Sequence, residues 1–181
     1  MKRTTALSLL IPCVLAAGAL ACASGGAGVA ITCTPPSVST DGWRVVDHGD
    51  FSIRMPADFV AIDVQGIDSR VGAYRAPGDA AEVTFDLGWY SNELPPDQGT
   101  YAQYDACTDV VGGHPVRIVV GELREPSEIG GRHVVAAAWR DIRSSDPAVH
   151  LTVWTTARDA AYVPTLLAIV RSVELKRATG D

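Results

Sequence analysis

The chain has 181 residues, of which 47% are apolar and 20% charged, and its formal net charge is −6 at pH 7. This length suits one domain with a real hydrophobic core, and the composition is ordinary for a globular protein. The acidic balance argues against binding to nucleic acid and against electrostatic docking on anionic lipid.

The first 21 residues predict an export signal. Lys2 and Arg3 form a positively charged start, and the run from Ala6 to Leu20 carries no charge. This apolar run is short for a membrane span, and small residues follow it. We therefore expect residues 1–21 to be removed as a signal peptide, with a single-span anchor as the alternative.

A cysteine follows the apolar run, in the sequence GALAC at 18–22. Small and apolar residues before a cysteine resemble the lipobox of bacterial lipoproteins, and the resemblance implies cleavage before Cys22 and diacylation of its thiol. The commonest lipobox has Leu three places before the cysteine, where this chain has Ala19. The prediction is a cell-envelope lipoprotein, anchored in the membrane through Cys22 and facing the periplasm or the exterior. The alternative is ordinary signal-peptidase cleavage, which would give a soluble secreted or periplasmic protein.

Two of the other cysteines, Cys33 and Cys107, lie beyond the signal. An exported protein resides in an oxidising compartment, so this even pair predicts a disulfide that joins the amino-terminal tail to the domain. Such a bond would close a long loop and contribute a few kcal/mol at best. Two unpaired thiols are the alternative.

The composition changes along the exported part of the chain. Residues 22–40 are small, polar and Pro-containing, which predicts a lipidated cysteine followed by a flexible tether. Short alternating runs then predict a globular domain at 41–176, with a tail at 177–181. The first expected strands are 43–47, 51–55, 71–75 and 82–89. Two hairpins are expected next, 106–111 with 115–123 and 133–142 with 149–155.

One helix is expected near the carboxyl end, within 158–170, where apolar residues recur at helical spacing. Pro164 fits only in a first turn, so the regular helix should begin near Tyr162 or Val163, with Thr156 or Asp159 as its cap. A short last strand is expected at 172–176. The predicted class is α+β: a single domain with a largely antiparallel sheet of about six to seven strands and a C-terminal helix packed on it.

Three segments carry a resemblance to a known fold: FSIRMPADF at 51–59, FDLGWYSN at 85–92 and LLAIVRSVEL at 166–175. Their order and spacing resemble the Mog1/PsbP-like superfamily over about residues 41–176. The resemblance implies an antiparallel sheet with helices packed on it, and a binding or assembly role. Members act as partners of a small GTPase, as extrinsic photosystem subunits and as envelope lipoproteins, so the fold does not give the function. The resemblance carries no catalytic residue onto this chain.

Motifs for chemistry are absent from the sequence. The histidines lack the spacing of a metal site, and we interpret them as unrelated surface or rim residues: His48, His114, His133 and His150. There is no G-x-S-x-G motif and no phosphate loop, and Ser69 lies in an expected turn. No cofactor and no metal are therefore expected.

The segment FDLGWYSN at 85–92 is the best candidate for a site. On a strand, one face would carry the core residues Phe85, Leu87 and Trp89, and the other Asp86, Gly88 and Tyr90. A glycine within a strand indicates a close approach or a bend. Three interpretations stay open: a loop or helix of the same chain covers Gly88 while Asp86 bonds its backbone, the strand bulges, or a ligand or partner binds this face.

Two functions follow from these observations. The first is a cell-envelope lipoprotein whose exported domain has a non-catalytic binding or assembly role toward an unidentified envelope protein or component. The candidate binding residues are Asp68, Asp86, Gly88 and Tyr90. The alternative is an exported hydrolase that uses Asp68 and/or Asp86, which can approach across neighbouring strands. A pocket with two convergent titratable groups would favour the hydrolase.

Overall fold

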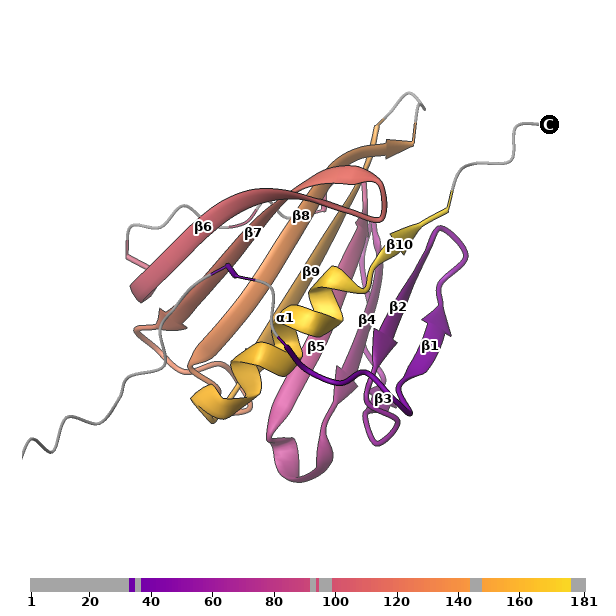
Figure 1. Cartoon of the computed structure of the whole chain (residues 1–181). Helices are drawn as coiled ribbons and strands as arrows, with labels where there is room; N and C mark the ends of the chain where they lie inside the picture. Colours follow the sequence, from indigo (N-terminus) through magenta and orange to yellow (C-terminus); the bar gives the residue numbers. More distant parts are fainter. Residues whose placement is uncertain (1–32, 35–36, 92–93, 95–98, 144–147, 177–181) are drawn as a thin grey trace, which may run out of the picture.

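The structure is a computed structural model that describes residues 33–34, 37–91, 94, 99–143 and 148–176. Within this part of the chain, the strands form two sheets. The seven-stranded sheet has the order β3-β4-β5-β9-β8-β7-β6, and the three-stranded sheet has the order β1-β2-β10. Figure 1 shows the helix α1 lying across the large sheet beside the small one.

All strand pairs of the large sheet are antiparallel. Its strands are β3 (Val60–Ile62), β4 (Arg70–Arg75), β5 (Ala81–Gly88), β6 (Tyr101–Val111), β7 (His114–Leu123), β8 (His133–Arg143) and β9 (Val149–Ala157), and the 3-10 turn η1 (Pro77–Asp79) joins β4 to β5. Val, Ile and Thr are frequent in β7 and β9, and such β-branched residues favour a pleated, half-buried surface.

The two faces of the large sheet differ in what covers them. Along β5, buried residues alternate with half-buried ones, so one side of the strand enters the main core. That core includes Phe85, Ala137 and Val153 and is closed by α1; we call this side the helix face. The opposite side, here named the open face, has a smaller buried cluster: Leu94, Tyr101, Val119, Leu123, Val134 and Ala136.

The small sheet and the helix complete the domain. The small sheet pairs β2 (Phe51–Met55) with β1 (Arg44–Asp47) and with β10 (Glu174–Leu175), both antiparallel. The helix α1 (Val163–Arg171) follows the 3-10 turn η2 (Ala160–Tyr162), where the Asp159 carboxylate accepts a hydrogen bond from the Ala161 N–H. Its buried residues form one side that packs on the helix face: Val163, Leu166, Leu167, Ile169 and Val170.

The predicted α+β class is confirmed, including the largely antiparallel sheet and the packed C-terminal helix. The helix begins at Val163 with a proline in its first turn, as predicted, and Asp159 caps the preceding turn. The strand β3 was not predicted because it has only three residues and no alternation of polar and apolar side chains. The turn at 144–147 lies outside the described residues.

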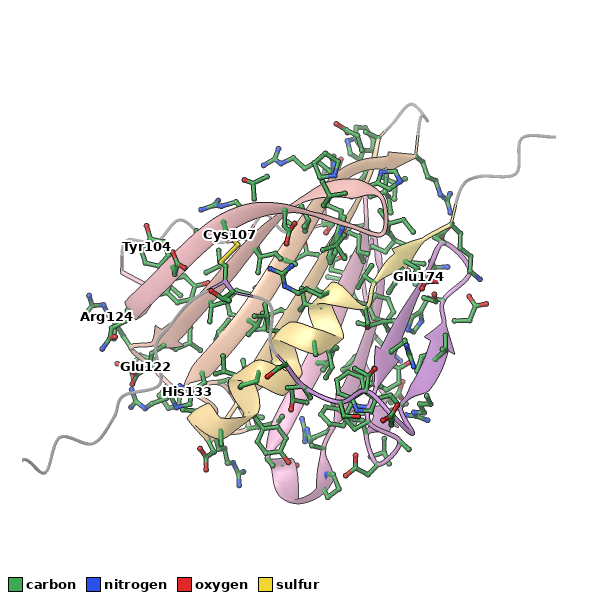
Figure 2. All side chains as sticks on the ribbon, viewed as in Figure 1. Tyr104, Cys107, Glu122, Arg124, His133 and Glu174 are labelled. Carbon is green, nitrogen blue, oxygen red and sulfur yellow. A yellow bond between two sulfur atoms is a disulfide. The ribbon has the colours of Figure 1, made fainter. Side chains whose placement is uncertain are left out.

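Cys33 marks where the described chain enters the domain. Its side chain is buried, and its Cα lies 6.2 Å from that of Cys107 on β6, with the two sulfurs at disulfide distance. Its N–H donates to Asp105 at 3.2 Å, and its carbonyl accepts from Arg171 at 2.7 Å. Figure 2 shows this sulfur pair at Cys107, on the side of the sheet that carries α1.

The predicted signal peptide and Cys22 lie outside the described residues, as do most of the predicted tether and the tail at 177–181. Among the helices of the described part, none is long and apolar enough to cross a membrane.

Candidate functional site

The open face of the large sheet carries a row of side chains that runs across the strands. The register pairs Thr108 with Arg117, Arg117 with Ala138, Ala138 with Thr152, and Thr152 with Asp86. Neighbouring strands lie about 4.8 Å apart, so residues in one such row contact their neighbours directly. Two cavities open along this row, one around Asp86 and one around Arg117.

Leu94 and Thr152 line both cavities and therefore stand between them. The Leu94 side chain is buried and belongs to the cluster that also contains Val119 and Ala136. Leu94 thus lies on the open face, at the boundary between two hollows.

The first hollow, here named the Asp86 cavity, has a volume of about 640 Å³. Its described walls are mostly apolar, with Val71, Ala73 and Trp154 among them. One oxygen of Asp86 (Oδ1) is buried and has no hydrogen-bond partner among the described residues. A buried acceptor without a partner is uncommon in folded proteins, so this carboxylate is a candidate contact for a ligand.

The second hollow, here named the arginine cavity, has a volume of about 650 Å³. Its polar walls carry Thr108, Arg117, Arg140 and His150, and apolar walls come from β7 and β8. None of the described residues that line it is an aspartate or a glutamate. The described lining therefore carries two arginines and no acid, in a chain whose net charge is −6.

The hydrogen bond at His150 defines which ring nitrogen carries a proton. The backbone N–H of Asp141 donates to His150 Nδ1 at 3.2 Å. Asp141 adopts the left-handed backbone conformation (φ 51°), within the irregularity between Trp139 and Arg143 on β8. Because Nδ1 accepts this bond, the neutral ring carries its proton on Nε2 and offers a donor there.

Two aromatic residues stand at the edge of the arginine cavity. The rings of Trp89 and Tyr90 are stacked, with centroids 5.2 Å apart and planes 19° apart, and the residues are 56% and 63% exposed. The prediction that Trp89 belongs to the core with Phe85 and Leu87 is wrong. The strand β5 ends at Gly88, so Trp89 lies in the turn and loses the orientation that alternation would give it.

Ser91 anchors this turn to the sheet. Its hydroxyl is buried and lies 3.0 Å from the Asp86 carbonyl and 3.0 Å from the Thr152 hydroxyl. Because the turn is tied to β5 and β9 at Ser91, the two preceding aromatic rings are held at the cavity edge.

The predicted site residues do not form one cluster. Asp86 lines one cavity and Tyr90 the other. A Cβ on Gly88 would lie 2.7 Å from Ser69 Cβ, so a loop of the same chain covers this glycine. The hydrogen bond from that loop's backbone to Asp86, which the same interpretation expected, is not made by Oδ1, which has no partner among the described residues. Asp68 is exposed and lines neither cavity.

His48 lies away from the open face, in an aromatic cluster at the edge of the main core. Its ring centroid is 4.3 Å from that of Phe85 and 4.8 Å from that of Phe51, and its Nε2 lies 3.4 Å from the Tyr74 hydroxyl. Burial of the ring lowers the pKa of His48, and the positive charge of Arg70 lowers it further. Within the described part of the chain, no three His, Cys, Asp or Glu residues gather as metal ligands.

The sequence interpretation missed Arg117, Arg140 and His150. They come from three consecutive strands, β7, β8 and β9. The predicted hairpin at 133–142 and 149–155 paired the strands of Arg140 and His150, but neither the pairing of β7 with β8 nor the register was predicted. Alternation on β7 did carry a partial signal, because Arg117 points away from the buried Val116 and Ile118.

Comparison with known proteins gives the fold neighbours of this chain. No protein-family model matches it, and no curated protein matches it. Among solved structures, a protein from Bacteroides thetaiotaomicron VPI-5482 is similar at 9% identity with a TM-score of 0.44, covering 76% of this chain and 49% of that one. A point mutant of the protein Mog1 is similar at 11% identity with a TM-score of 0.44, covering 76% of this chain and 97% of that one. The chain spans about half the length of the Bacteroides protein, and the α+β class rests on the topology described above.

Proposed function

We propose that this chain is a bacterial cell-envelope lipoprotein whose exported domain binds an envelope component, without catalysis, through the open face of its large sheet. The observation that carries the proposal is the pair of cavities on either side of Leu94, with exposed Trp89 and Tyr90 at the edge of one. Concave, partly apolar sites with a few placed polar groups are the usual form of ligand sites.

A binding role fits the polar groups better than hydrolysis does. General acid–base chemistry needs at least two groups that converge on a substrate. Asp86 has no second carboxylate and no histidine among the described residues that line its cavity. Asp68, the other acid of the hydrolase alternative, lies outside that cavity. No specific contact in the described part favours the hydrolase.

The position of Cys33 also fits a tethered binding domain. Its sulfur lies close to the Ile118 carbonyl, and the residue packs into the core on the helix face. A bond from Cys33 to Cys107, which we propose forms in the envelope, would hold the tail on that face. The tether would then leave the domain on the side opposite the two cavities, so the open face would stay accessible to a partner.

Site-specific photocrosslinking in native envelopes tests the binding face. A benzoyl-phenylalanine at position 90 should crosslink to an envelope component, because Tyr90 stands 63% exposed at the cavity edge. The matched control is position 45, because Val45 is 61% exposed on β1, away from the open face. Equal crosslinking at both positions, or none at position 90, would contradict the proposal.

The anchor is tested separately by Cys22→Ala. We expect the variant to move from the membrane fraction to the soluble fraction, because it lacks the thiol that carries the diacylglycerol. The control is Cys13→Ala, which changes a cysteine inside the predicted signal peptide and should leave the distribution unchanged. Membrane association of both variants would refute the lipid anchor.

A further inference from the structure

We propose that the arginine cavity binds a small organic anion with an aromatic body, such as a ring that carries a carboxylate or a phosphate. The inference rests on the proposed binding function and names the ligand class for one of its two cavities. It draws on three observations: the sign of the local charge, the kind of hydrogen-bonding groups and the stacked aromatic pair.

The local charge is opposite to that of the whole chain. Two arginines, Arg117 and Arg140, line the cavity, and no acid stands among its described lining residues. One carboxylate of the described part, that of Asp141, lies 3.8 Å from His150 Nδ1, and its side chain is 71% exposed to solvent. Concave low-dielectric walls strengthen the field of the charges that line them, so the hollow should attract anions.

The polar groups of the cavity are mainly donors. An arginine guanidinium has five N–H donors and no acceptor, and its fork matches the two oxygens of a carboxylate or a phosphate. Arg117 is paired with Ala138 on the neighbouring strand, whose side chain is a single methyl group, and both residues line the cavity. His150 adds a donor at Nε2, because its Nδ1 accepts the Asp141 N–H. Such a set of donors suits an acceptor-rich ligand.

The aromatic pair supplies the other half of the recognition. Trp89 and Tyr90 stack on each other and stay more than half exposed, and a contiguous exposed apolar patch is a common mark of a binding site. A ligand ring can add to this stack in an offset arrangement. The volume of about 650 Å³ is sufficient for one or two fused rings with an anionic substituent.

Two probes of the same shape and opposite charge test the ligand class. Naphthoate and naphthylmethylammonium share the ring system, and their binding to the full chain can be measured by calorimetry at low salt. We expect naphthoate to bind at least about ten-fold more tightly than the cation. Arg117→Gln should weaken naphthoate about ten-fold by loss of a charge-assisted hydrogen bond. Trp89→Ala should weaken both probes, because the stack is independent of charge.

The matched control is Arg54→Gln, which removes an exposed arginine from β2 in the small sheet and should leave binding of both probes unchanged. Arg117 is also exposed, so its variant should fold, and the unfolding temperature of each variant checks this. Equal affinity for the two probes, or an Arg117→Gln variant that binds naphthoate as tightly as the parent, would overturn the inference. If position 90 crosslinks to an envelope component but the two probes bind with equal affinity, the proposed binding face stands and only the proposed ligand class is rejected.

Discussion

Asp86 and Arg117 lie in the same cross-strand row of the open face, with Thr152 and Ala138 between them. Each lines a different cavity, so opposite charges stand at two sides of one face without forming an ion pair with each other. Leu94 and Thr152 occupy the boundary between the two hollows. This separation is what makes two recognition sites of opposite sign possible on one sheet.

A first prediction concerns the loop that covers β5. Gly88→Ala should destabilise the fold by about 1–3 kcal/mol, because overpacking a filled site forces neighbours to move. The new Cβ would meet Ser69 Cβ at 2.7 Å and Ser69 Cα at 3.2 Å. Chemical denaturation would measure the loss in the free energy of unfolding.

The control for this change is the double variant Gly88→Ala with Ser69→Gly. Removing the nearest atom should restore part of the stability, and the restored part measures the direct contact between the two positions. An unchanged free energy of unfolding in Gly88→Ala would show that the loop at 66–69 does not rest on Gly88.

Much of the fold could be predicted from local patterns. The alternation on β5 identified Phe85 and Leu87 as core, and Pro164 placed the start of the helix. These features depend on neighbouring residues in the sequence. An alternation with a period of two identifies the buried side of a strand, and the missing N–H of a proline identifies the first turn of a helix. The same reasoning failed at Trp89, because the end of a strand depends on the turn that follows and not on the alternation before it.

The site could be predicted only in part, because it is assembled by register. Asp86 was a candidate, since its segment combines an acid, a glycine and aromatic residues. Arg117 and His150 lie on β7 and β9. The sequence predicted β8 and β9 as a hairpin, but it did not predict that β8 also pairs with β7. The charge of the cavity therefore depends on the strand order and register, which decide which side chains share the cavity and which cannot be read from one sequence.

A second prediction concerns pH. The folded state lowers the pKa of His48 below 6.5, through burial first and the charge of Arg70 second, while Asp47 opposes the shift. Between the lowered pKa and 6.5 the unfolded chain binds more protons, so stability rises with pH in this window. The contribution of His48 should be fully present above 6.5 and decline as the pH falls toward the folded pKa.

The measurement is the unfolding temperature of the parent and of His48→Gln across this window. The variant should lose the part of the pH dependence that His48 supplies, and His114→Gln serves as the control. Identical pH profiles for the parent and His48→Gln would show that the aromatic cluster of Phe51, Tyr74 and Phe85 does not penalise the charged ring.

A third prediction concerns the disulfide between Cys33 and Cys107. If Cys33 and Cys107 are bonded, reductant should lower the unfolding temperature of the parent, with a loss of about 2–4 kcal/mol for a native disulfide. Cys107→Ala should start at the lower stability and show no response to reductant. Alkylation of two thiols in the untreated, exported protein would contradict the bond.

The fourth prediction compares two acids on the same side of β5. Asp86 Oδ1 is buried without a partner among the described residues, whereas Glu82 accepts from Arg75 Nε at 2.9 Å and from Nη2 at 2.5 Å. Asp86→Asn should stabilise the fold by about 1 kcal/mol, because the amide removes a poorly solvated carboxylate while keeping its shape. Glu82→Gln should instead destabilise it, because a paired charge is lost. Destabilisation of the fold by both variants would show that Asp86 is satisfied in the free protein, and the argument for a ligand in its cavity would fail with it.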